Sequence, residues 1–351
     1  MNNIQPLLSI CIPTNNRRIQ LESLVNSIVT QPEFKTGWVE ISISDNASTD
    51  GTLEYLDILG KHYAVIVNIN KTNLGPVLNF QKAIENSSGK YVWLLGSDDL
   101  LADYCLKGII ETLEKESDCE YFMINNLYWF SGETFTQPYK FREIPNKLPR
   151  VEDYSHHRAN KVSELISKRS DAFTPMYSSI MTRNHWLNAF KITEPHKHTF
   201  ETINNCSFFA VYIAKNLFLK PGYYYGTPAV LASHTIGWEH YRALFAIQRL
   251  ADLYDLWIKN SGNKSIVMKY KKELFGFTHK QMVIQLLRRE TGGYQYFSFV
   301  KYLRQFYGIY SISDLFDIFK RCAFTDGVDY KLKFRIKLSR IKKYILKNIS
   351  L

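Results

Sequence analysis

The stretch LLSICIPTNNR, residues 7–17, decides the fold, because a short apolar run ends there in a polar turn. A buried strand of a parallel sheet has this pattern, since both of its faces are covered and its carboxyl end opens into a loop. Within the first 125 residues the same pattern predicts four more strands. These predicted strands span residues 39–43, 65–69, 91–95 and 121–124.

Helical patterns separate these apolar runs. Leu21, Leu24, Val25 and Ile28, for example, recur at spacings of three and four, which is typical of one face of a helix. Strands that alternate with helices indicate an α/β fold with a doubly wound, mostly parallel sheet. Ligands of such sheets bind at the carboxyl ends of the strands, so the loops that follow the strands are where we look for a functional site.

Length and charge predict two regions. The chain has 351 residues, of which 45% are hydrophobic and 22% charged, and this composition excludes a disordered or collagen-like protein. Residues 1–235 carry 22 basic and 24 acidic side chains, whereas residues 236–351 carry 22 basic and nine acidic ones. We therefore expect a catalytic domain over residues 1–235 and a mainly helical, basic region over residues 236–351.

Cysteine usage and the absence of export signals predict a cytoplasmic protein. The five cysteines form no CxxC pair and do not resemble a disulfide framework, which fits a reducing compartment. The first residues lack the basic start and long apolar core of a signal peptide. No stretch has the roughly 20 mostly apolar residues that a spanning helix needs, so we expect a protein that is soluble or bound to a membrane surface.

Polar residues follow four successive predicted strands. Each loop alone is compatible with a simple helix cap, because Ser, Thr, Asp and Asn are favoured there. Four such loops at neighbouring strand ends favour a binding site instead. The loops are PTNNR at 13–17, SDNASTDGT at 44–52, NLGP at 73–76 and GSDD at 96–99.

The adjacent carboxylates Asp98 and Asp99 predict a metal site. Two neighbouring carboxylates repel each other unless a positive charge lies between them. Mg²⁺ and Mn²⁺ prefer oxygen ligands and are often held by one or two carboxylates together with substrate phosphates. With Asp45 at a neighbouring strand end, the pair indicates a metal and diphosphate site. The alternative is that Asp99 only caps the helix expected around residues 106–113.

The four motifs, in this order, resemble the nucleotide-sugar domain of family 2 glycosyltransferases, which have the GT-A fold. The resemblance covers residues 5–125, and its wording is similar to bacterial O-antigen transferases of the abequosyltransferase type. It implies a nucleoside-diphosphate sugar as donor, a Mn²⁺ or Mg²⁺ ion and a saccharide acceptor. It also implies an enzyme of the hexosyltransferase type.

The resemblance assigns roles to individual residues. Pro13, Thr14 and Asn15 would lie against the nucleoside, and Asp45 with Asn46 would hydrogen-bond base and ribose. Asp98 would be the metal ligand, with Asp99 and His234 as further metal candidates, although a lone histidine is more often structural. The donor-binding residues predicted in this way are Pro13, Thr14, Asn15, Arg17, Asp45, Asn46, Asn73, Gly75, Asn79, Ser97 and Asp98.

The chain departs from the family pattern at two positions. Gly96 stands where the first acid of an Asp-x-Asp motif is expected, so the metal is either bound more weakly or held mainly through the diphosphate. Leu78 stands where a basic residue is common. We therefore expect Arg17, Lys71 or Lys82 to help with the phosphates.

An inverting transferase needs a carboxylate that takes the proton of the acceptor hydroxyl. In enzymes that resemble this one, the acid follows the metal motif at the start of a helix. Glu201, which stands 102 positions after Asp99, is the first candidate for this general base, and Asp171 is the second. The alternative for Glu201 is a helix-start glutamate that interacts with the helix dipole.

The C-terminal segment 331–347 combines eight basic residues with apolar residues at helical spacing, among them Phe334, Leu338 and Ile341. Such a segment is either an interfacial helix on anionic lipid or a terminal helix packed on its own domain. We favour the inner face of the cytoplasmic membrane, since acceptors of the resembled enzymes are carried on a lipid diphosphate. The charge has no recognisable nucleic-acid motif beside it, so no nucleic acid is expected as a partner.

These observations predict a metal-dependent glycosyltransferase that acts on a saccharide acceptor, in particular a lipid-linked oligosaccharide of O-antigen or capsule synthesis. A catalytically inactive nucleotide-sugar-binding homologue is the main alternative, because Gly96 and Leu78 depart from the pattern. A nucleotidyltransferase would need a Gly-rich phosphate loop near the N-terminus, and the sequence has none there.

Overall fold

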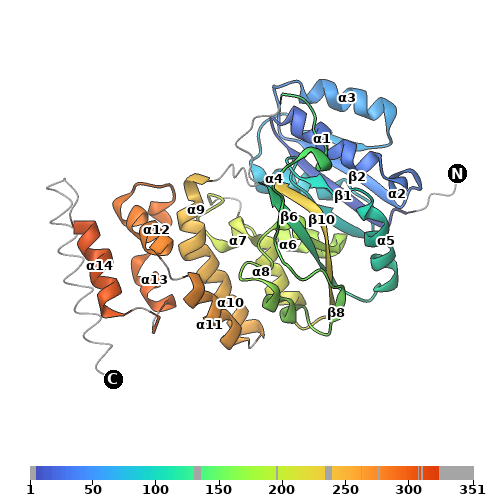
Figure 1. The fold of residues 1–351 in the computed structure, drawn as a ribbon. Helices are drawn as coiled ribbons and strands as arrows, with labels where there is room; N and C mark the ends of the chain where they lie inside the picture. Colours follow the sequence, from blue (N-terminus) through green and yellow to red (C-terminus); the bar gives the residue numbers. More distant parts are fainter. Residues whose placement is uncertain are drawn as a thin grey trace.

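A ten-stranded sheet forms the centre of the protein in a computed structural model (Figure 1). The model describes residues 5–129, 136–194, 197–233, 239–261, 263–274, 277–306, 308–309 and 311–323. The strand order is β3-β2-β1-β4-β9-β6-β10-β5, with β7 paired to β6 and β8 paired to β10. The strands are β1 (Leu8–Thr14), β2 (Val39–Asp45), β3 (Ile66–Ile69), β4 (Tyr91–Leu94), β5 (Leu100–Leu101), β6 (Tyr121–Trp129), β7 (Leu148–Pro149), β8 (His157–Ala159), β9 (Ser179–Thr182) and β10 (Gly222–Ser233).

The sheet is mostly parallel, as predicted. β1 pairs in parallel with β2 and β4, and β2 pairs in parallel with β3. β6 and β10 also run parallel to each other, whereas β9 is antiparallel to both β4 and β6. All five predicted strands are present. β1 and β2 extend two residues beyond the apolar runs, because backbone pairing continues through polar side chains.

Helices cover the sheet where the sequence pattern places them. α1 spans Arg18–Val29 and buries Leu21, Leu24, Val25 and Ile28, the residues whose spacing predicted it. The other helices of the first half are α2 (Pro32–Lys35), α3 (Thr52–His62), α4 (Pro76–Glu85) and α5 (Cys105–Lys115).

Short elements connect β6 to β10. The segment after β6 contains β7, β8 and a 3₁₀ segment at Val162–Lys168, and another 3₁₀ turn at Met176–Ser178 leads into β9. Three helices follow before β10, namely α6 (Arg183–Phe190), α7 (Ile203–Cys206) and α8 (Phe208–Tyr212), and a π-helical turn at Ile213–Leu217 extends the last of them. The four described cysteines Cys11, Cys105, Cys119 and Cys206 are free thiols, in agreement with the predicted lack of a disulfide framework.

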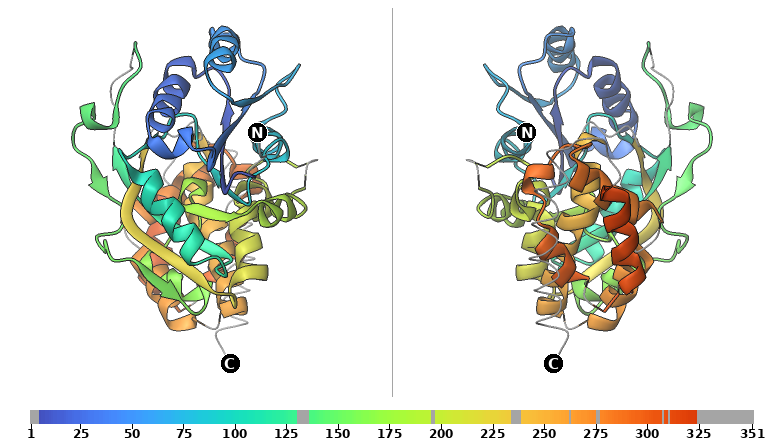
Figure 2. Two further views of the ribbon diagram at one scale, coloured as in Figure 1. Left: turned by 90° about the vertical axis from the view of Figure 1, so that its right-hand side faces the viewer. Right: turned by 90° about the vertical axis from the view of Figure 1, so that its left-hand side faces the viewer.

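The region after β10 is helical in its described part, and it packs beside the sheet (Figures 1 and 2). None of the described helices has the length and apolar composition of a membrane-spanning segment. His234 and the basic segment 331–347 lie outside the described residues. The helices of this region are α9 (Arg242–Leu244), α10 (Leu250–Ser261), α11 (Lys264–Leu274), α12 (Phe277–Arg288), α13 (Phe299–Gln305) and α14 (Ile312–Ala323).

One hydrophobic cluster joins the sheet to these helices. Trp257 of α10 is fully buried, and its ring meets Phe173 edge-on with centroids 5.5 Å apart. Tyr270 of α11 donates a hydrogen bond to the carbonyl of Ile166 at 2.8 Å. The cluster also includes Met123 of β6. A domain boundary at residue 235 stays a prediction, and the buried contacts across it stabilise both regions together.

Candidate functional site

The carboxyl ends of β1 and β2 lie side by side because the two strands pair in register. Thr14 is the partner of Asp45 in this pairing, and both residues are buried. The backbone amide of Asn46 donates to the carbonyl of Thr14 at 2.9 Å. The backbone amide of Asn70, just after β3, donates to the carbonyl of Asp45, also at 2.9 Å. Three predicted loops therefore meet at one edge of the sheet.

Two buried polar atoms at this edge have no hydrogen-bond partner among the residues that the structure describes. One is Oδ1 of Asp45, whose other carboxylate oxygen accepts from the Ser48 amide at 3.0 Å. The other is Oγ1 of Thr14. An unpaired buried polar group costs about 1–3 kcal/mol, so these two atoms lower the free energy of unfolding of the free protein. Such orphaned atoms are expected where a ligand supplies the missing partners.

A ladder of asparagines joins the loops after β1, β2 and β3. Asn15 donates from Nδ2 to the carbonyl of Asn46 at 2.8 Å. Asn46 donates from Nδ2 to Oδ1 of Asn73 at 2.9 Å, and its own Oδ1 accepts from the Leu74 amide at 2.8 Å. Oδ1 of Asn73 accepts from the amide of Gly75 at 2.9 Å. These predicted donor-binding residues hold one another in place.

Helix α4 is tied to the same ladder. Asn79 is buried and donates to the carbonyl of Thr14 at 3.3 Å, and its Oδ1 accepts from Asn70 at 3.0 Å. Gly75 caps α4 with φ +79°, a left-handed conformation that glycine adopts without strain. Asn73, Gly75 and Asn79 therefore shape the site rather than project freely into it.

Asn16 and Asp50 are two loop residues that our sequence reasoning missed. Asn16 has φ +52°, and its Oδ1 accepts from the Thr49 amide at 2.7 Å. Oδ2 of Asp50 accepts from the Arg18 amide at 3.0 Å, which caps the start of α1. Both residues stand inside the PTNNR and SDNASTDGT motifs. Their residue types, which are favoured at helix caps, could have indicated these roles.

The GSDD motif forms a tight turn that presents Asp98. The Asp99 amide donates to the carbonyl of Gly96 at 3.0 Å, and the Gly96 amide donates to Oδ2 of Asp99 at 2.8 Å. A Cβ on residue 96 would lie 2.8 Å from Oδ1 of Asp98 and 3.1 Å from Oδ2 of Asp99. A side chain at position 96 would therefore require the carboxylates of Asp98 and Asp99 to shift, and glycine leaves room for both.

The two acids of this turn differ in environment. Asp99 is buried, and burial together with the neighbouring Asp98 charge raises its pKa well above the usual range. It accepts hydrogen bonds from the backbones of Gly96 and Ser233. The carboxylate of Asp98 is 22% exposed and forms an ion pair with Arg17, with Nη1 and Oδ1 2.7 Å apart. Asp98 is therefore the carboxylate that can reach a ligand.

The alternative role of Asp99 as a helix cap is wrong. α5 begins at Cys105, its cap residue is Tyr104, and Oε1 of Gln31 accepts from the Leu106 amide in its first turn at 2.9 Å. Asp99 instead closes its own turn, so it is poorly placed as a metal ligand. One carboxylate from Asp98 fits a Mg²⁺ or Mn²⁺ ion that takes its other ligands from water and substrate phosphates. His234 lies outside the described residues.

A second group of potential metal ligands lies elsewhere, at Glu116, Asp118 and Cys119. Arg158 pairs with both carboxylates, at 3.0 Å and 2.5 Å. Burial raises the pKa of the Cys119 thiol to about 11, so the thiol is protonated near neutral pH. This group is an arginine-bound surface cluster and not a competing metal centre.

Two tyrosines that the charges of the acidic turn affect, Tyr139 and Tyr177, were not predicted. Burial raises the pKa of Tyr139, and the charges of Asp98 and Asp99 raise it further. Burial, Tyr128 and the charge of Asp99 likewise act on Tyr177, whose pKa is raised well above its ordinary value. The raised pKa values keep the phenols of Tyr139 and Tyr177 neutral, so both can donate hydrogen bonds. They come from segments remote in sequence, so no local motif signals them.

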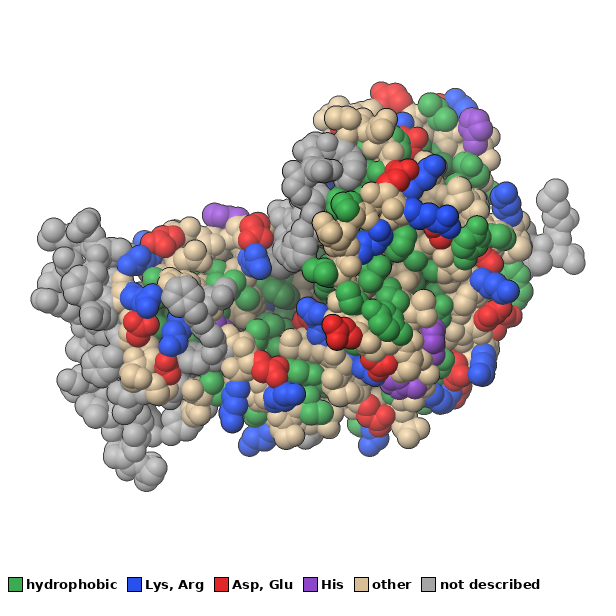
Figure 3. Space-filling view, viewed as in Figure 1, with side chains coloured by type: hydrophobic (Ala, Val, Ile, Leu, Met, Phe, Trp, Pro, Cys, Tyr) green, Lys and Arg blue, Asp and Glu red, His purple; other side chains and the backbone are tan. Residues whose placement is uncertain are grey.

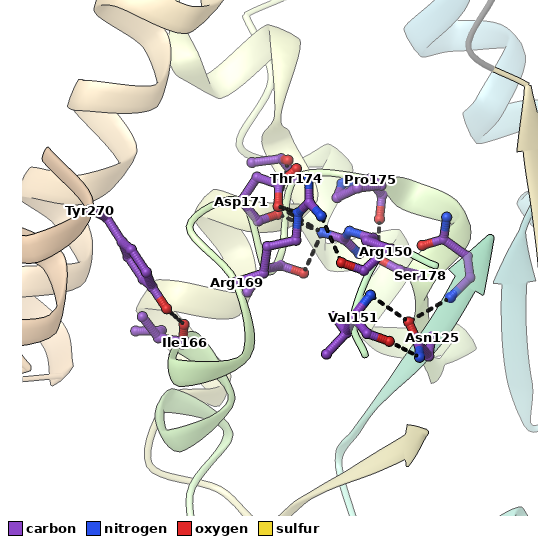
Figure 4. Close-up of polar contacts among 12 residues, drawn as sticks. Asn125, Arg150, Val151, Ile166, Arg169, Asp171, Thr174, Pro175, Ser178 and Tyr270 are labelled. Atoms are coloured by element: carbon purple, nitrogen blue, oxygen red, sulfur yellow. Dashed lines mark hydrogen bonds and ion pairs between the residues drawn. The ribbon is translucent and has the colours of Figure 1, made fainter. Parts of the chain in front are cut away.

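Asp171 lies in a cluster of arginines (Figure 4). Arg150 is fully buried and donates from Nη2 to Oδ1 of Asp171 at 3.2 Å and to its carbonyl at 2.9 Å. Arg169 reaches the same Oδ1 at 2.6 Å. Burial would raise the pKa of Asp171, but the two guanidinium groups outweigh it and lower the pKa. A carboxylate held in this way is a weak proton acceptor.

Glu201 lies on a loop that is anchored from both sides. Asn205 donates from Nδ2 to the carbonyls of Glu194 and Lys197, and the buried Arg249 donates to the carbonyl of Phe200 at 3.0 Å. α7 begins at Ile203 with no acid in its first turn, so Glu201 precedes the helix. Its carboxylate is partly exposed, and no ion pair among the described residues holds it.

The loop carrying Glu201 lies between the sheet and the helices. In Figure 1, α7 sits between the two regions, and Figure 3 shows the surface hollowed there, with hydrophobic side chains in the recess. The model brings together the predicted residues Thr14, Asn15, Asp45 and Asn46. The structure also pairs Arg17 with Asp98. Among the described residues, neither Glu201 nor Asp171 forms a hydrogen bond or an ion pair with any of these residues.

The first part of the chain matches a known family. Residues 9–161 match the family described as Glycosyl transferase family 2. The chain is 45% identical over 114 residues to abequosyltransferase RfbV of Salmonella typhimurium. This aligned segment covers 32% of this chain and 34% of that protein. It is 34% identical over 115 residues to GalNAc(5)-diNAcBac-PP-undecaprenol beta-1,3-glucosyltransferase of Campylobacter jejuni, over 32% of this chain and 35% of that one. The matches span about a third of these relatives.

Solved structures share the fold at low sequence identity. TarS 1–349 of S. aureus superposes with a TM-score of 0.53 at 16% identity, over 80% of this chain and 79% of that one. Mannosyltransferase PcManGT of Pyrobaculum calidifontis, in complex with GDP-Man and Mn²⁺, gives a TM-score of 0.50 at 14% identity, over 94% and 83%. These similarities show the fold alone.

The strand-end loops and the matching segment define a class of protein. Residues 9–161 are similar to family 2 glycosyltransferases, and the fold is GT-A-like. Within that family the predicted resemblance to the abequosyltransferase type is confirmed.

The arginine cluster predicts that Asp171 acts mainly in stability. Asp171→Ala leaves the buried Arg150 charge without its carboxylate partner, so we expect the free energy of unfolding to fall by about 3 kcal/mol at pH 7. A lowered pKa stabilises the fold above the unfolded value of about 3.9. The difference between wild type and variant should therefore be constant from about pH 5 to 8 and shrink as pH falls through the folded pKa.

Urea unfolding at several pH values measures this difference. Asp57→Ala is the matched control, because Asp57 pairs with Lys61 on the exposed face of α3 and its loss should change stability little. Equal stabilities of Asp171→Ala and the wild type would contradict the assigned role and leave Asp171 free to act as a base.

Proposed function

We propose that the chain is a glycosyltransferase that moves a sugar from a nucleoside-diphosphate sugar to a saccharide acceptor. The observation that carries the proposal is the meeting of four polar loops at one edge of the sheet, inside the segment that matches family 2. That edge combines unpaired buried polar atoms with a partly exposed carboxylate beside an arginine. A nucleoside needs hydrogen-bonding partners such as the unpaired polar atoms. A diphosphate with its metal ion needs charged groups such as the carboxylate and the arginine.

The nucleoside of the donor would lie against Pro13, Thr14 and Asn15. Oδ1 of Asp45 and Oγ1 of Thr14 would hydrogen-bond it, and Asn46 would hold the loop around it. Both orphaned atoms are buried, so the loops above them must open when the nucleoside enters. The hydrogen bonds gained would offset the cost of keeping these atoms unpaired in the free protein.

The diphosphate would lie at the acidic turn, with Ser97 and Asp98 beside it. Asp98 would hold a Mn²⁺ or Mg²⁺ ion together with the phosphate oxygens. Such an ion, when bound, neutralises the charge that develops on the leaving diphosphate. Asp99 shapes the turn through its hydrogen bonds to the backbones of Gly96 and Ser233.

In the proposed reaction the oxygen of an acceptor hydroxyl forms a bond to the anomeric carbon of the donor sugar. The bond between that carbon and the phosphate oxygen breaks, and the nucleoside diphosphate leaves with the electron pair. Glu201 takes the hydroxyl proton as general base. Its partial exposure and the lack of an ion pair among the described residues support this role over Asp171, which two arginines occupy.

We further propose a lipid-linked acceptor of bacterial O-antigen or capsule synthesis. The printed name of the Campylobacter jejuni relative contains a PP-undecaprenol acceptor, which supports this class of substrate. Such an acceptor lies at a membrane, and segment 331–347 has the basic and apolar pattern of an interfacial helix. The protein would then work at the inner face of the cytoplasmic membrane.

Asp98→Asn should abolish sugar transfer and donor hydrolysis while leaving the fold intact, because the neutral amide removes the exposed charge at the diphosphate. The assay follows release of the nucleoside diphosphate from a panel of UDP-, CDP-, GDP- and dTDP-sugars with Mn²⁺. Asp103→Asn is the matched control, since Asp103 lies just beyond β5 and pairs with Arg142. Nucleotide binding without turnover by the wild type would identify an inactive homologue, and full activity of Asp98→Asn would rule out the metal assignment.

Glu201→Gln should lower kcat by about 10²–10⁴-fold, the usual contribution of a general base, without weakening nucleotide binding. Transfer rates and titration calorimetry with the nucleoside diphosphate separate the two effects. Glu239→Gln serves as a control, because Glu239 is exposed and pairs with Arg242. A kcat within twofold of the wild-type value would exclude Glu201 as the base.

Removal of residues 331–351 should weaken binding to vesicles that contain anionic lipid, because each basic residue near such a surface contributes roughly 1 kcal/mol. Transfer to a water-soluble acceptor should change little. Vesicle sedimentation and the transfer assay are run on the same preparations. Equal losses of binding and transfer would show that the segment belongs to the fold.

A further inference from the structure

Arg17 is the cation that faces the acidic turn in the described part of the chain. Its Nη1 lies 2.7 Å from Oδ1 of Asp98, and the two side chains are 36% and 22% exposed. Its charge also acts on buried Asp99, whose pKa it lowers against the larger effects of burial and Asp98. The ion pair therefore closes the position at which the diphosphate and its metal ion are proposed to bind.

Two other cations near these loops, Lys82 and Arg18, are engaged elsewhere, whereas Lys71 is exposed in the loop after β3. Lys82 pairs with Glu85 at 2.8 Å. Arg18, which follows Arg17 directly, lies over the ring of Tyr55 at 4.2 Å and forms an ion pair with Glu22. Of two adjacent arginines, one stabilises the outer surface of α1 and the other faces Asp98.

The backbone of Arg17 is fixed, whereas the end of its side chain is not. The amide of the next residue donates to Oδ2 of Asp50 at 3.0 Å, and the carbonyl of Arg17 accepts from the Leu21 amide at 2.9 Å. Within the described part of the chain, the guanidinium pairs through Nη1 with Asp98 alone. It can therefore change partner without any change in the fold.

We propose that Arg17 is a placeholder cation, which holds Asp98 in the free protein and transfers to the donor diphosphate when a divalent cation binds Asp98. This inference rests on the proposed function and deepens it. A partly exposed ion pair contributes little to stability, so breaking it for a new partner costs little free energy. The planar guanidinium pairs with phosphate through two parallel hydrogen bonds, and such charge-assisted bonds are stronger than neutral ones.

The exchange couples the metal ion to the diphosphate. Mn²⁺ alone must displace Arg17 from Asp98 and leave the guanidinium unpaired, whereas the diphosphate alone must displace Asp98 and leave a carboxylate beside new negative charge. Bound together, the two ligands pair all four charged groups. Each ligand should therefore raise the affinity of the other by the same factor, as linkage requires.

Arg17→Ala should change the two affinities in opposite directions. Mn²⁺ alone should bind the variant more tightly than the wild type, because Asp98 has lost its competitor. UDP, CDP, GDP or dTDP with Mn²⁺ should bind about tenfold more weakly or worse, as the loss of a charge-assisted hydrogen bond implies. Arg17→Lys should fall between, since a lysine keeps the charge but lacks the planar pair of donors.

The measurements are Mn²⁺ binding by electron paramagnetic resonance and nucleotide binding by titration calorimetry, with thermal unfolding to check the fold. Arg18→Ala is the matched control and should leave both affinities unchanged. Weaker or unchanged Mn²⁺ binding to Arg17→Ala would overturn the exchange, and so would unchanged diphosphate binding. A wild type that binds none of the four nucleotides would refute the proposed function as well.

Discussion

The parallel pairing of β1 with β2 on one side and β4 on the other is the constraint on which the site depends. In-register pairing puts Thr14 directly beside Asp45, and β4 ends immediately before the turn that carries Asp98. A slip of one residue would turn every side chain of a strand to its other face. The site is thus specified by the buried core strands rather than by the loops themselves.

Charge then divides the site into two parts with different physics. On the nucleoside side, Asp45 and Thr14 are buried and incompletely hydrogen-bonded. These unpaired atoms lower the stability of the free protein and are available to a ligand. On the phosphate side, the Asp98 carboxylate is balanced by Arg17 at the surface. Burial and the neighbouring Asp98 charge raise the pKa of Asp99, whereas the Arg17 charge lowers it.

The strands and the strand-end loops could be predicted because they depend on local patterns. The apolar run before Pro13 and the motif at Asp45 lie within single segments, and short-range periodicity identifies them. The strand limits were less accurate, since pairing continues into polar residues that carry no apolar signal. The contribution of Gly96 could be noted as a departure, but its reason emerged only from the closeness of its Cβ position to Asp98 and Asp99.

The remaining parts of the site depend on contacts between distant segments. Arg150 and Asp171 are 21 positions apart and meet only because β7 follows β6 back across the sheet. Arg169, two positions before Asp171, is a local partner of its carboxylate, but nothing in the nearby sequence indicates the contact with Arg150. The two tyrosines that the acidic turn affects come from similarly separate segments, and the anchoring of the Glu201 loop depends on Arg249 in the helical region.

A crystal structure of the chain with Mn²⁺ and the nucleoside diphosphate that binds it tightly tests the central claim most directly. We expect the nucleobase to lie beside Thr14 and Asp45, and the metal ion to lie between Asp98 and both phosphates. A nucleotide bound away from the ends of β1, β2 and β4 would contradict this expectation.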